Sequence, residues 1–382
     1  MTRPHRAIAD WAVNERPPPT SSDPFRAKPT FRVPQLKTAI GDASVARATI
    51  LAFVHGYPPA HGSGAEHMLH ALLRDSVERG HRAIVVCANA SPAGSGPYEL
   101  EGVEVGGRPE LPAALQDADV MVGHLAWTAE VVQAAAEHRI PLIYLCHNDR
   151  QLQYWRSWLK PESATVTVWN SRWVGDILAQ TWSGPGVVIR PPCLLRDYEI
   201  LDDPDPRGFI TLVNVQRPKG STMFYALAAR PPGRRFLAVE GAYGSQQHPP
   251  PEAQNVIWQP QTADMRGDVY ARTRILLVPS EYESWGRCAV EAMCAGIPVI
   301  AHPTPGLVEA LGDAALFVRL EAGVDAWDAA IAELDNPDTY ALWSARARRR
   351  AAWLDSQSHD DLDLWDQVIR GCADAGRVTS AA

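Results

Sequence analysis

The sequence ILLVPSEYESWGRCAVEAMCAGIPVI spans residues 275–300 and decides the fold class of the chain. It begins with an unbroken apolar run at 275–278, which is typical of a parallel strand buried on both faces. Gly296 is placed to end a helix, and Pro298 precedes a second apolar run at 299–300. The stretch therefore predicts a strand, a loop, a helix and a second strand in succession.

The same stretch predicts a site that binds an anion beside hydroxyl groups. Ser284 is the expected N-cap of the helix, so the backbone N–H groups of residues 285–287 would point out of a helix N-terminus, where phosphates bind. Glu283 and Glu291 lie in the loop and in the helix, eight residues apart. Carboxylates next to an anion site favour hydroxyl groups as partners, because they are strong hydrogen-bond acceptors. Hydroxyls next to phosphates describe a nucleotide sugar.

Length and composition limit the classes of protein to consider. A chain of 382 residues exceeds the usual size of one core, and its 46% hydrophobic content can fill two. The net charge of −8 disfavours nucleic acids and anionic membrane surfaces as partners. The six cysteines have no metal-binding spacing, and no signal peptide or transmembrane segment is visible. We therefore expect a cytoplasmic protein with reduced, buried thiols.

Repeated βα units in both halves of the chain predict an α/β protein with two doubly wound, Rossmann-like domains that face each other across a cleft. Residues 1–45 are rich in proline and predict an extension of the folded body. We place the domains at 46–198 and 199–355. Residues 356–382 have helical spacing, and we expect this helix to pack back on the first domain.

Three further features lie where open α/β sheets bind ligands. His124 and His147 each follow a predicted strand, at the carboxyl end where such ligands sit. Lys219 stands at the start of a helix, so its charge and the helix dipole would act on the same diphosphate. A glycine-rich loop at 62–64 opens the first helix, but its spacing does not match a dinucleotide-binding fingerprint.

The pair Glu283 and Glu291, followed by EAMCAGIPV, resembles the signature of retaining glycosyltransferases with the GT-B fold, the glycosyltransferase group 1 or family 4-like enzymes. The loop at 62–66, GSGAE, resembles the loop that closes over the sugar phosphate in that family. His124 falls where the family places a histidine facing the donor sugar. The resemblance covers about residues 48–355, and it implies that the first domain takes the acceptor and the second takes the donor.

The chain departs from the family pattern at one position. The family has an arginine five residues before the lysine, whereas this chain has Asn214 there. Two interpretations are open: Arg217 supplies the guanidinium from elsewhere in the loop, or Lys219 alone holds the diphosphate.

The resemblance implies a retaining hexosyltransferase that uses a nucleotide sugar and no cofactor. UDP, GDP and ADP donors all stay open, and a UDP-sugar is preferred only because it is the commonest. Glu283, His124 and Lys219 are the expected catalytic residues. Glu291 would bind ribose hydroxyls, while Glu283 would hold a sugar hydroxyl or face an oxocarbenium-like centre. The expected donor-binding residues are Lys219, Arg217, Glu291, Ser284, Trp285, Gly286, Arg287, Gly62, Ser63 and Gly64. No carboxylate cluster suggests a metal, and the family generally works without one.

Two alternatives stay open from the sequence. A GT-B-like epimerase or phosphorolytic enzyme would act on a sugar nucleotide without an acceptor. A degenerate relative would bind a glycan or a nucleotide sugar without turnover, which the asparagine at 214 leaves possible. The acceptor and the oligomeric state are not predicted.

Overall fold

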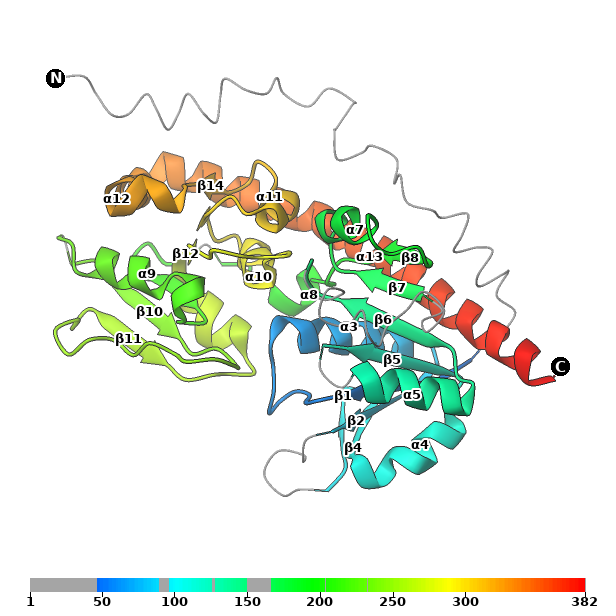
Figure 1. Cartoon of the computed structure of the whole chain (residues 1–382). Coiled ribbons are helices and arrows are strands. Elements are labelled where there is room, and N and C mark those ends of the chain that lie inside the picture. Colours follow the sequence, from blue (N-terminus) through cyan, green and yellow to red (C-terminus); the bar gives the residue numbers. More distant parts are fainter. Residues whose placement is uncertain are drawn as a thin grey trace, which may run out of the picture.

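The computed structural model describes residues 47–88, 96–125, 128–149, 166–202, 204–231 and 233–381, with side chains up to residue 377. The predicted extension at 1–45 lies outside the described residues. Figure 1 shows two α/β bodies side by side, with a long helix running along both.

The first body is built on an eight-stranded sheet among the described residues, parallel except for the pairing of its first two strands. Alternate residues of the strand at 49–54 pack into two different cores, so both faces of the sheet are buried. In spatial order the strands are β3 (Tyr98–Leu100), β4 (Val103–Gly107), β2 (Arg82–Cys87), β1 (Thr49–Val54), β5 (Val120–His124), β6 (Leu142–Cys146), β7 (Val166–Trp169) and β8 (Gly186–Val188). The helices of this body are α3 (Gly64–Glu78), α4 (Leu111–Asp117, after the 3-10 turn η3, Arg108–Glu110), α5 (Thr128–His138) and α7 (Arg172–Leu178).

The second body carries a parallel sheet of six described strands, which is also covered on both faces. In spatial order they are β11 (Val256–Gln259), β10 (Phe236–Val239), β9 (Phe209–Val213), β12 (Thr273–Val278), β13 (Val299–Ala301) and β14 (Leu316–Phe317). Its helices and helical turns are α8 (Leu195–Tyr198), η4 (Arg217–Lys219), α9 (Ser221–Ala228), η5 (Met265–Val269), η6 (Tyr270–Arg272), α10 (Arg287–Cys294), α11 (Pro305–Leu311), η7 (Leu320–Ala322) and α12 (Gly323–Glu333). The predicted strand–loop–helix–strand stretch is thus β12, α10 and β13.

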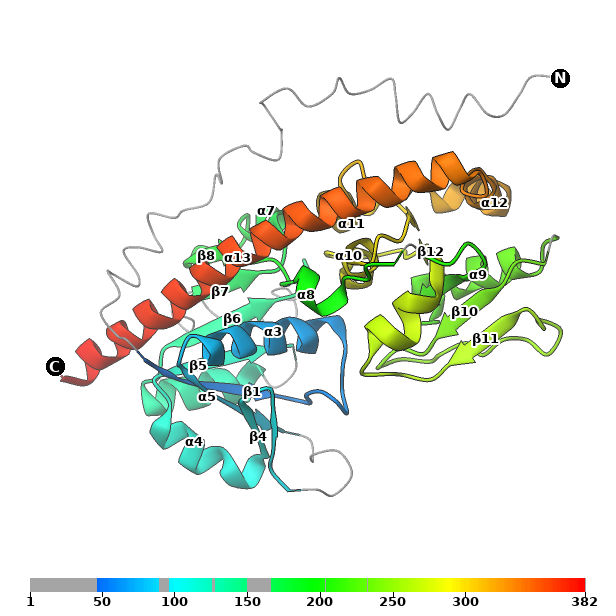
Figure 2. The ribbon, with the colours of Figure 1, turned by 180° about the vertical axis from the view of Figure 1, so that it is seen from behind.

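Helix α13 (Pro337–Ala381) joins the two bodies, as both Figure 1 and Figure 2 show. Its first half packs into the core of the second body through Ala347, Ala351 and Leu354. Its second half packs into the core of the first body, where Trp365 is fully buried and donates a hydrogen bond to Ser76. The helix therefore does not begin anew at residue 356: one continuous helix crosses that expected boundary, because apolar residues repeat at helical spacing on both sides of it.

The described helices include none that combines the length and the apolar character needed to cross a membrane. All six cysteines are free, and five of them are buried. Strands β3 and β4 and helix α4 were not among the expected elements, because their apolar runs are short and are interrupted by charged or glycine residues.

Candidate functional site

The loop after β12 and the turn η4 bring Lys219 and Glu283 together. Lys219 Nζ lies 2.6 Å from Glu283 Oε1, and Ser280 Oγ donates to the same oxygen at 2.9 Å. Gly220 makes this approach possible, because its φ of +93° suits glycine and a Cβ there would lie 2.5 Å from the carbonyl oxygen of Pro279. The predicted catalytic pair of the second domain is therefore preassembled as an ion pair.

The charge of Lys219 is secured by its partner. Burial alone would lower the pKa of the ammonium group, but the Glu283 carboxylate outweighs burial, so the pKa of Lys219 is raised above its ordinary value. The pair is largely shielded from water, with the side chains 22% and 14% exposed. A cation in this setting attracts an anion more strongly than it would on an open surface.

Glu291 lies on the inner side of α10 and is also paired. Arg287 Nε donates to its Oε1 at 2.6 Å, and the Tyr270 hydroxyl donates to its Oε2 at 2.6 Å. Arg287 in turn donates to the Tyr198 hydroxyl at 2.8 Å, while its Nη1 is buried without a hydrogen-bond partner. Both oxygens of Glu291 therefore already have one protein partner, although each keeps a lone pair for a further donor such as a ribose hydroxyl.

The N-terminus of α10 lies two residues later than expected, which corrects the assignment of Ser284 as its N-cap. The N-cap is Gly286, whose φ of +90° favours glycine, and the helix starts at Arg287. Ser284 Oγ instead accepts a hydrogen bond from Asn170 of the first domain at 2.9 Å. Trp285 is buried in the core of the second domain, and its N–H group precedes the helix. The expected anion site is therefore displaced toward the N–H groups of Arg287 and the residue after it.

The position of the missing arginine has a structural role. Asn214 has a φ of +69°, a conformation that asparagine adopts more readily than most residues. Its Oδ1 accepts hydrogen bonds from Gln216 and Gln246 at 2.8 and 3.0 Å. Arg217 is exposed, and no hydrogen bond or ion pair of its side chain is found among the described residues. The structure thus brings Lys219, and not Arg217, into contact with Glu283.

The first domain contributes a pair of buried histidines. His124 ends β5 and His147 follows β6, as expected, and His124 Nδ1 lies 2.9 Å from His147 Nε2. Burial, reinforced by the neighbouring imidazole, lowers the pKa of His124 to about 3, and burial lowers the pKa of His147 to about 4. Both rings are therefore neutral at pH 7. His124 Nε2 is buried without a hydrogen-bond partner.

The glycine-rich loop approaches the second domain. A Cβ at Gly62 would lie 2.9 Å from His67 Nε2 and 3.6 Å from Gln261 Nε2, so this glycine keeps the two domains close without a clash. Burial and then the Arg287 guanidinium of the second domain lower the pKa of His67 to about 4. Ser63 is the N-cap of α3 and donates to Glu66, whereas Gly64 begins the helix.

Three residues of this loop region were not singled out from the sequence. His55 and His61 lie next to the fully buried Glu66, and the ring of His55 is 6.4 Å from that of His124. Glu66 is the last residue of the GSGAE loop, but the two histidines six residues apart form a pattern too common to indicate that they lie beside it.

Several hydrogen bonds tie the two faces together. Tyr282 donates to Asp149 at 2.8 Å, next to Glu283. Glu309 accepts hydrogen bonds from the backbone N–H groups of Arg172 and Trp173, at the N-terminus of α7. Asn170 of the first domain donates both to Ser284 Oγ and to the carbonyl oxygen of His147, so the loop that carries Glu283 lies next to the backbone of His147.

A hollow of about 760 Å³ elsewhere on the second domain includes Arg234 and Arg274 in its lining. Arg234 pairs with Asp328 and Asp335, and Arg274 pairs with Asp335. None of the predicted site residues lines this hollow, so we do not count it as part of the candidate site.

Comparisons with known proteins agree with this architecture. Residues 246–350 match the family model described as glycosyl transferases group 1. A D-inositol 3-phosphate glycosyltransferase of Mycobacteroides abscessus is 34% identical over 133 residues, which cover 31% of this chain and 30% of that protein. The corresponding protein of Rhodococcus opacus is 32% identical over 192 residues, 50% of this chain and 38% of that protein. This chain therefore spans well under half of the length of either relative.

Two solved structures have the same fold. Sucrose-phosphate synthase from Thermosynechococcus elongatus superposes with a TM-score of 0.66 at 17% identity, over 88% of this chain and all of that one. The Anabaena protein HepE in complex with UDP and glucose superposes with a TM-score of 0.64 at 16% identity, over 82% of this chain and 98% of that one. The predicted GT-B architecture is confirmed.

Proposed function

We propose, from the match of residues 246–350 to the family model of glycosyl transferases group 1 and from the GT-B fold, that this chain transfers a hexose-type sugar from a nucleotide sugar to an acceptor hydroxyl with retention of anomeric configuration. The observation that carries the proposal is the largely buried ion pair of Lys219 and Glu283. Ser284, next to Glu283, accepts a hydrogen bond from Asn170 of the first domain. A fixed cation next to a hydrogen-bond acceptor suits a substrate that combines a diphosphate with sugar hydroxyls.

The reaction breaks the bond between the anomeric carbon and the leaving phosphate oxygen, and negative charge grows on the nucleoside diphosphate. Lys219 would stabilise that charge together with the N–H groups at the start of α10. Glu283, which holds Lys219 in the absence of donor, would then accept a hydrogen bond from a sugar hydroxyl or face the positive anomeric centre. The acceptor hydroxyl forms the new bond to the anomeric carbon, and its proton leaves with the diphosphate.

The first domain would complete the site on the opposite side of the donor. His124 Nε2 has no protein partner, so it can donate to or accept from the sugar, depending on its tautomer. Ser63 and the glycines beside it would cover the sugar phosphate. Because the imidazole is neutral at pH 7, we propose that it orients the donor and does not carry a charge.

We propose a UDP-sugar as the donor, since HepE, which shares the fold, binds UDP and glucose. The transfer step as proposed uses no metal: Lys219 and the helix N-terminus supply the positive charge that a metal supplies in other sites. Glu291 would accept hydrogen bonds from ribose hydroxyls through its remaining lone pairs.

One observation favours a second candidate, a relative that binds a nucleotide sugar without transferring it. The residue at the family's arginine position, Asn214, is engaged by two glutamines, and Arg217 stays outside the contacts of the site. With one cation fewer, stabilisation of the leaving group would rest on Lys219.

The decisive experiment titrates the full chain with UDP-, GDP-, ADP- and dTDP-sugars and measures the thermal unfolding midpoint, with and without EDTA. A ligand at a hundred times its dissociation constant adds about 2.7 kcal/mol to the free energy of unfolding. We expect stabilisation by UDP-sugars that EDTA does not remove. A folded protein that no nucleotide sugar stabilises would contradict the donor site.

Turnover separates the two candidates, measured as release of nucleoside diphosphate with a panel of acceptors. We expect Glu283→Gln to lose activity by about a hundredfold or more. Glu281→Gln is the matched control, because this carboxylate is exposed two residues away on the same loop. Donor binding without turnover in the unmodified protein would favour the binding relative.

A further inference from the structure

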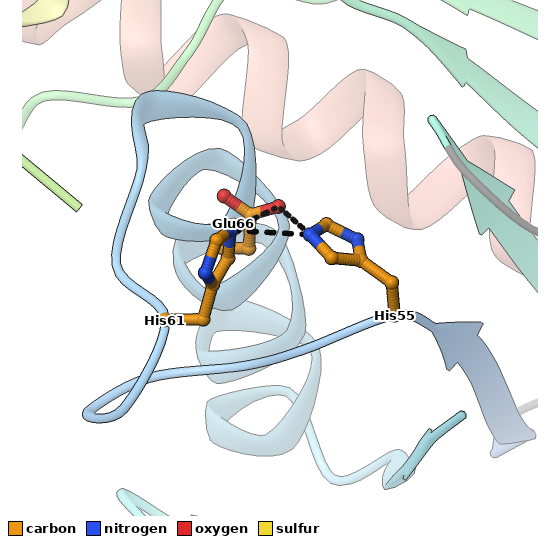
Figure 3. A group of neighbouring side chains, drawn as sticks. All are labelled: His55, His61 and Glu66. Atoms are coloured by element: carbon orange, nitrogen blue, oxygen red, sulfur yellow. Dashed lines mark hydrogen bonds and ion pairs between the residues drawn. The ribbon is translucent and has the colours of Figure 1, made fainter. Parts of the chain in front are cut away.

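Three side chains of the first domain point toward one another at the edge of the interdomain region, as Figure 3 shows. His55 follows β1, His61 lies in the connecting loop, and Glu66 belongs to the first turn of α3. His55 Nε2 lies 3.1 Å from His61 Nε2. Glu66 Oε1 lies 3.7 Å from the first of these nitrogens and 3.9 Å from the second.

These three distances match the coordination sphere of a transition metal. The point equidistant from the three atoms is the centre of the circle through them. From the three distances, this point lies about 2.1 Å from each atom. Zinc binds histidine nitrogen at about 2.0–2.1 Å and carboxylate oxygen at about 2.0–2.2 Å. An ion at that point would therefore lie within bonding distance of all three atoms.

The state of Glu66 independently points to a cation. Its side chain is completely buried, and Oε1 has no hydrogen-bond partner among the described residues. A buried carboxylate oxygen without a donor costs free energy unless a positive group reaches it. The two imidazoles of the cluster lie 3.7 and 3.9 Å from this oxygen.

The surroundings favour the metal-binding forms of these residues. Ser63 Oγ donates to Oε2 of Glu66, which leaves Oε1 directed at the histidines. Gly56 also allows the loop to fold tightly, since a Cβ there would lie 3.1 Å from the Cβ of His61.

We propose that His55, His61 and Glu66 form a binding site for one divalent ion of the zinc class. Two imidazoles and one carboxylate select Zn²⁺, Co²⁺ or Ni²⁺ over Mg²⁺ and Ca²⁺, which prefer oxygen ligands. Three protein ligands leave a coordination position for water or another small ligand. The sequence predicts no metal, from the lack of a carboxylate cluster and of metal-binding cysteine spacing, and this proposal departs from that prediction.

The ion would fix the loop that carries Gly62 and Ser63. Both residues lie between the second and third ligands, so coordination would hold this segment against α3 in the position that faces the second domain. This role does not depend on the proposed transfer reaction, in which no step uses a metal.

The test uses the full chain, freed of any affinity tag and stripped with EDTA that is then removed, without nucleotide sugar. Cobalt is titrated while the visible absorption is recorded, because bound Co²⁺ absorbs strongly at low coordination number. Zinc binding is then measured by calorimetry and by competition against bound cobalt. We expect one ion per chain and no comparable binding of Mg²⁺.

The variants His61→Ala and Glu66→Gln should each weaken binding by at least about tenfold, the lower end of the loss caused even by removing a residue that only orients a ligand. The His61 variant tests metal binding without disturbing the core, because the His61 side chain is 29% exposed, whereas Glu66 is fully buried. His359→Ala is the matched control, because this histidine is exposed on α13 and should not alter binding. Equal binding by all variants would reveal an adventitious ion only, and absence of stoichiometric binding would likewise overturn the proposal.

Discussion

The two faces of the interdomain region satisfy their polar groups in opposite ways. On the second domain, Lys219 pairs with Glu283, and Glu291 is held by Arg287 and Tyr270. On the first domain, buried polar atoms of His55, Glu66 and His124 have no hydrogen-bond partner. The carboxylates of the second domain are thus paired in the absence of ligand, although Arg287 Nη1 and Trp285 Nε1 are buried there without a described partner, whereas on the first domain a carboxylate oxygen is itself left unpaired.

This difference shows what a ligand must do on each face. At the Lys219–Glu283 pair of the second domain a ligand must replace an existing partner, so binding there exchanges one ion pair for another and its net gain in free energy is modest. On the first domain a ligand would bond to polar atoms that are buried from water and lack a described protein partner. Each such contact therefore contributes more free energy of binding. The predictions below test whether the second-domain pairs and the first-domain histidines behave in these ways.

The largest expected effect concerns the ion pair on α10. Glu291→Gln leaves the Arg287 guanidinium buried without a carboxylate, and we expect it to lower the free energy of unfolding by about 3–5 kcal/mol. Denaturant unfolding followed by circular dichroism measures the change. Adding Arg287→Met should restore part of the loss, because it removes the unpaired charge. An unchanged midpoint for the single variant would show that Glu291 and Arg287 are not paired in solution.

The next effect separates two cations of the same turn. Lys219→Ala should lower turnover by about a hundredfold or more, or about 2.7 kcal/mol, because it removes the charge that faces the leaving diphosphate. Arg217→Ala should change turnover by less than about threefold, since its side chain is exposed and makes no described contact. Steady-state kinetics with the donor identified by thermal shift measures both. Equal losses in the two variants would mean that Arg217 moves into the site when donor binds.

The smallest effect concerns the neutral histidines. The pKa of His147 is about 4 in the folded chain, against an ordinary value of about 6.5. Between these values the unfolded chain binds the proton and the folded chain does not, so stability falls as pH falls from 7 toward 4. At pH 5 this residue should cost about 2 kcal/mol relative to pH 7.

His147→Asn should therefore lose less stability between pH 7 and pH 5 than the unmodified chain, by about that amount. His359→Asn, at an exposed position, serves as the control and should follow the unmodified chain. Denaturant titrations at several pH values supply the comparison. Parallel curves for both variants and the unmodified chain would show that His147 is not held neutral by burial.

The residues that could be predicted from the sequence share one property: each lies at the end of a strand or the start of a helix that its own neighbours in the sequence define. Glu283 and Glu291 lie on one loop and the helix that follows, and Lys219 follows a strand that pairs with β12, so periodicity and strand order bring them to one edge. The two doubly wound α/β domains followed from the alternation of strands and helices, whereas the GT-B architecture was implied by the resemblance to retaining glycosyltransferases.

Pairing and backbone geometry could not be predicted in the same way. The helix N-cap moved from Ser284 to Gly286 because Ser284 instead accepts a hydrogen bond from Asn170 of the other domain. The substitution at Asn214 looked like a lost cation, whereas in the fold it is a left-handed turn held by two glutamines. Neither outcome is visible without the neighbours that the fold supplies.

Local patterning along the chain was thus enough to specify the fold class and to position Lys219, Glu283 and His124 at strand ends. Which groups are paired and which are left open depended on tertiary contacts: the reach of Arg287 to Glu291 and Tyr198, and the closure of His61 onto His55 and Glu66. The reason is physical. Strand and helix periods are set by backbone geometry within a few residues, whereas hydrogen-bond satisfaction and desolvation are properties of everything that surrounds a buried atom.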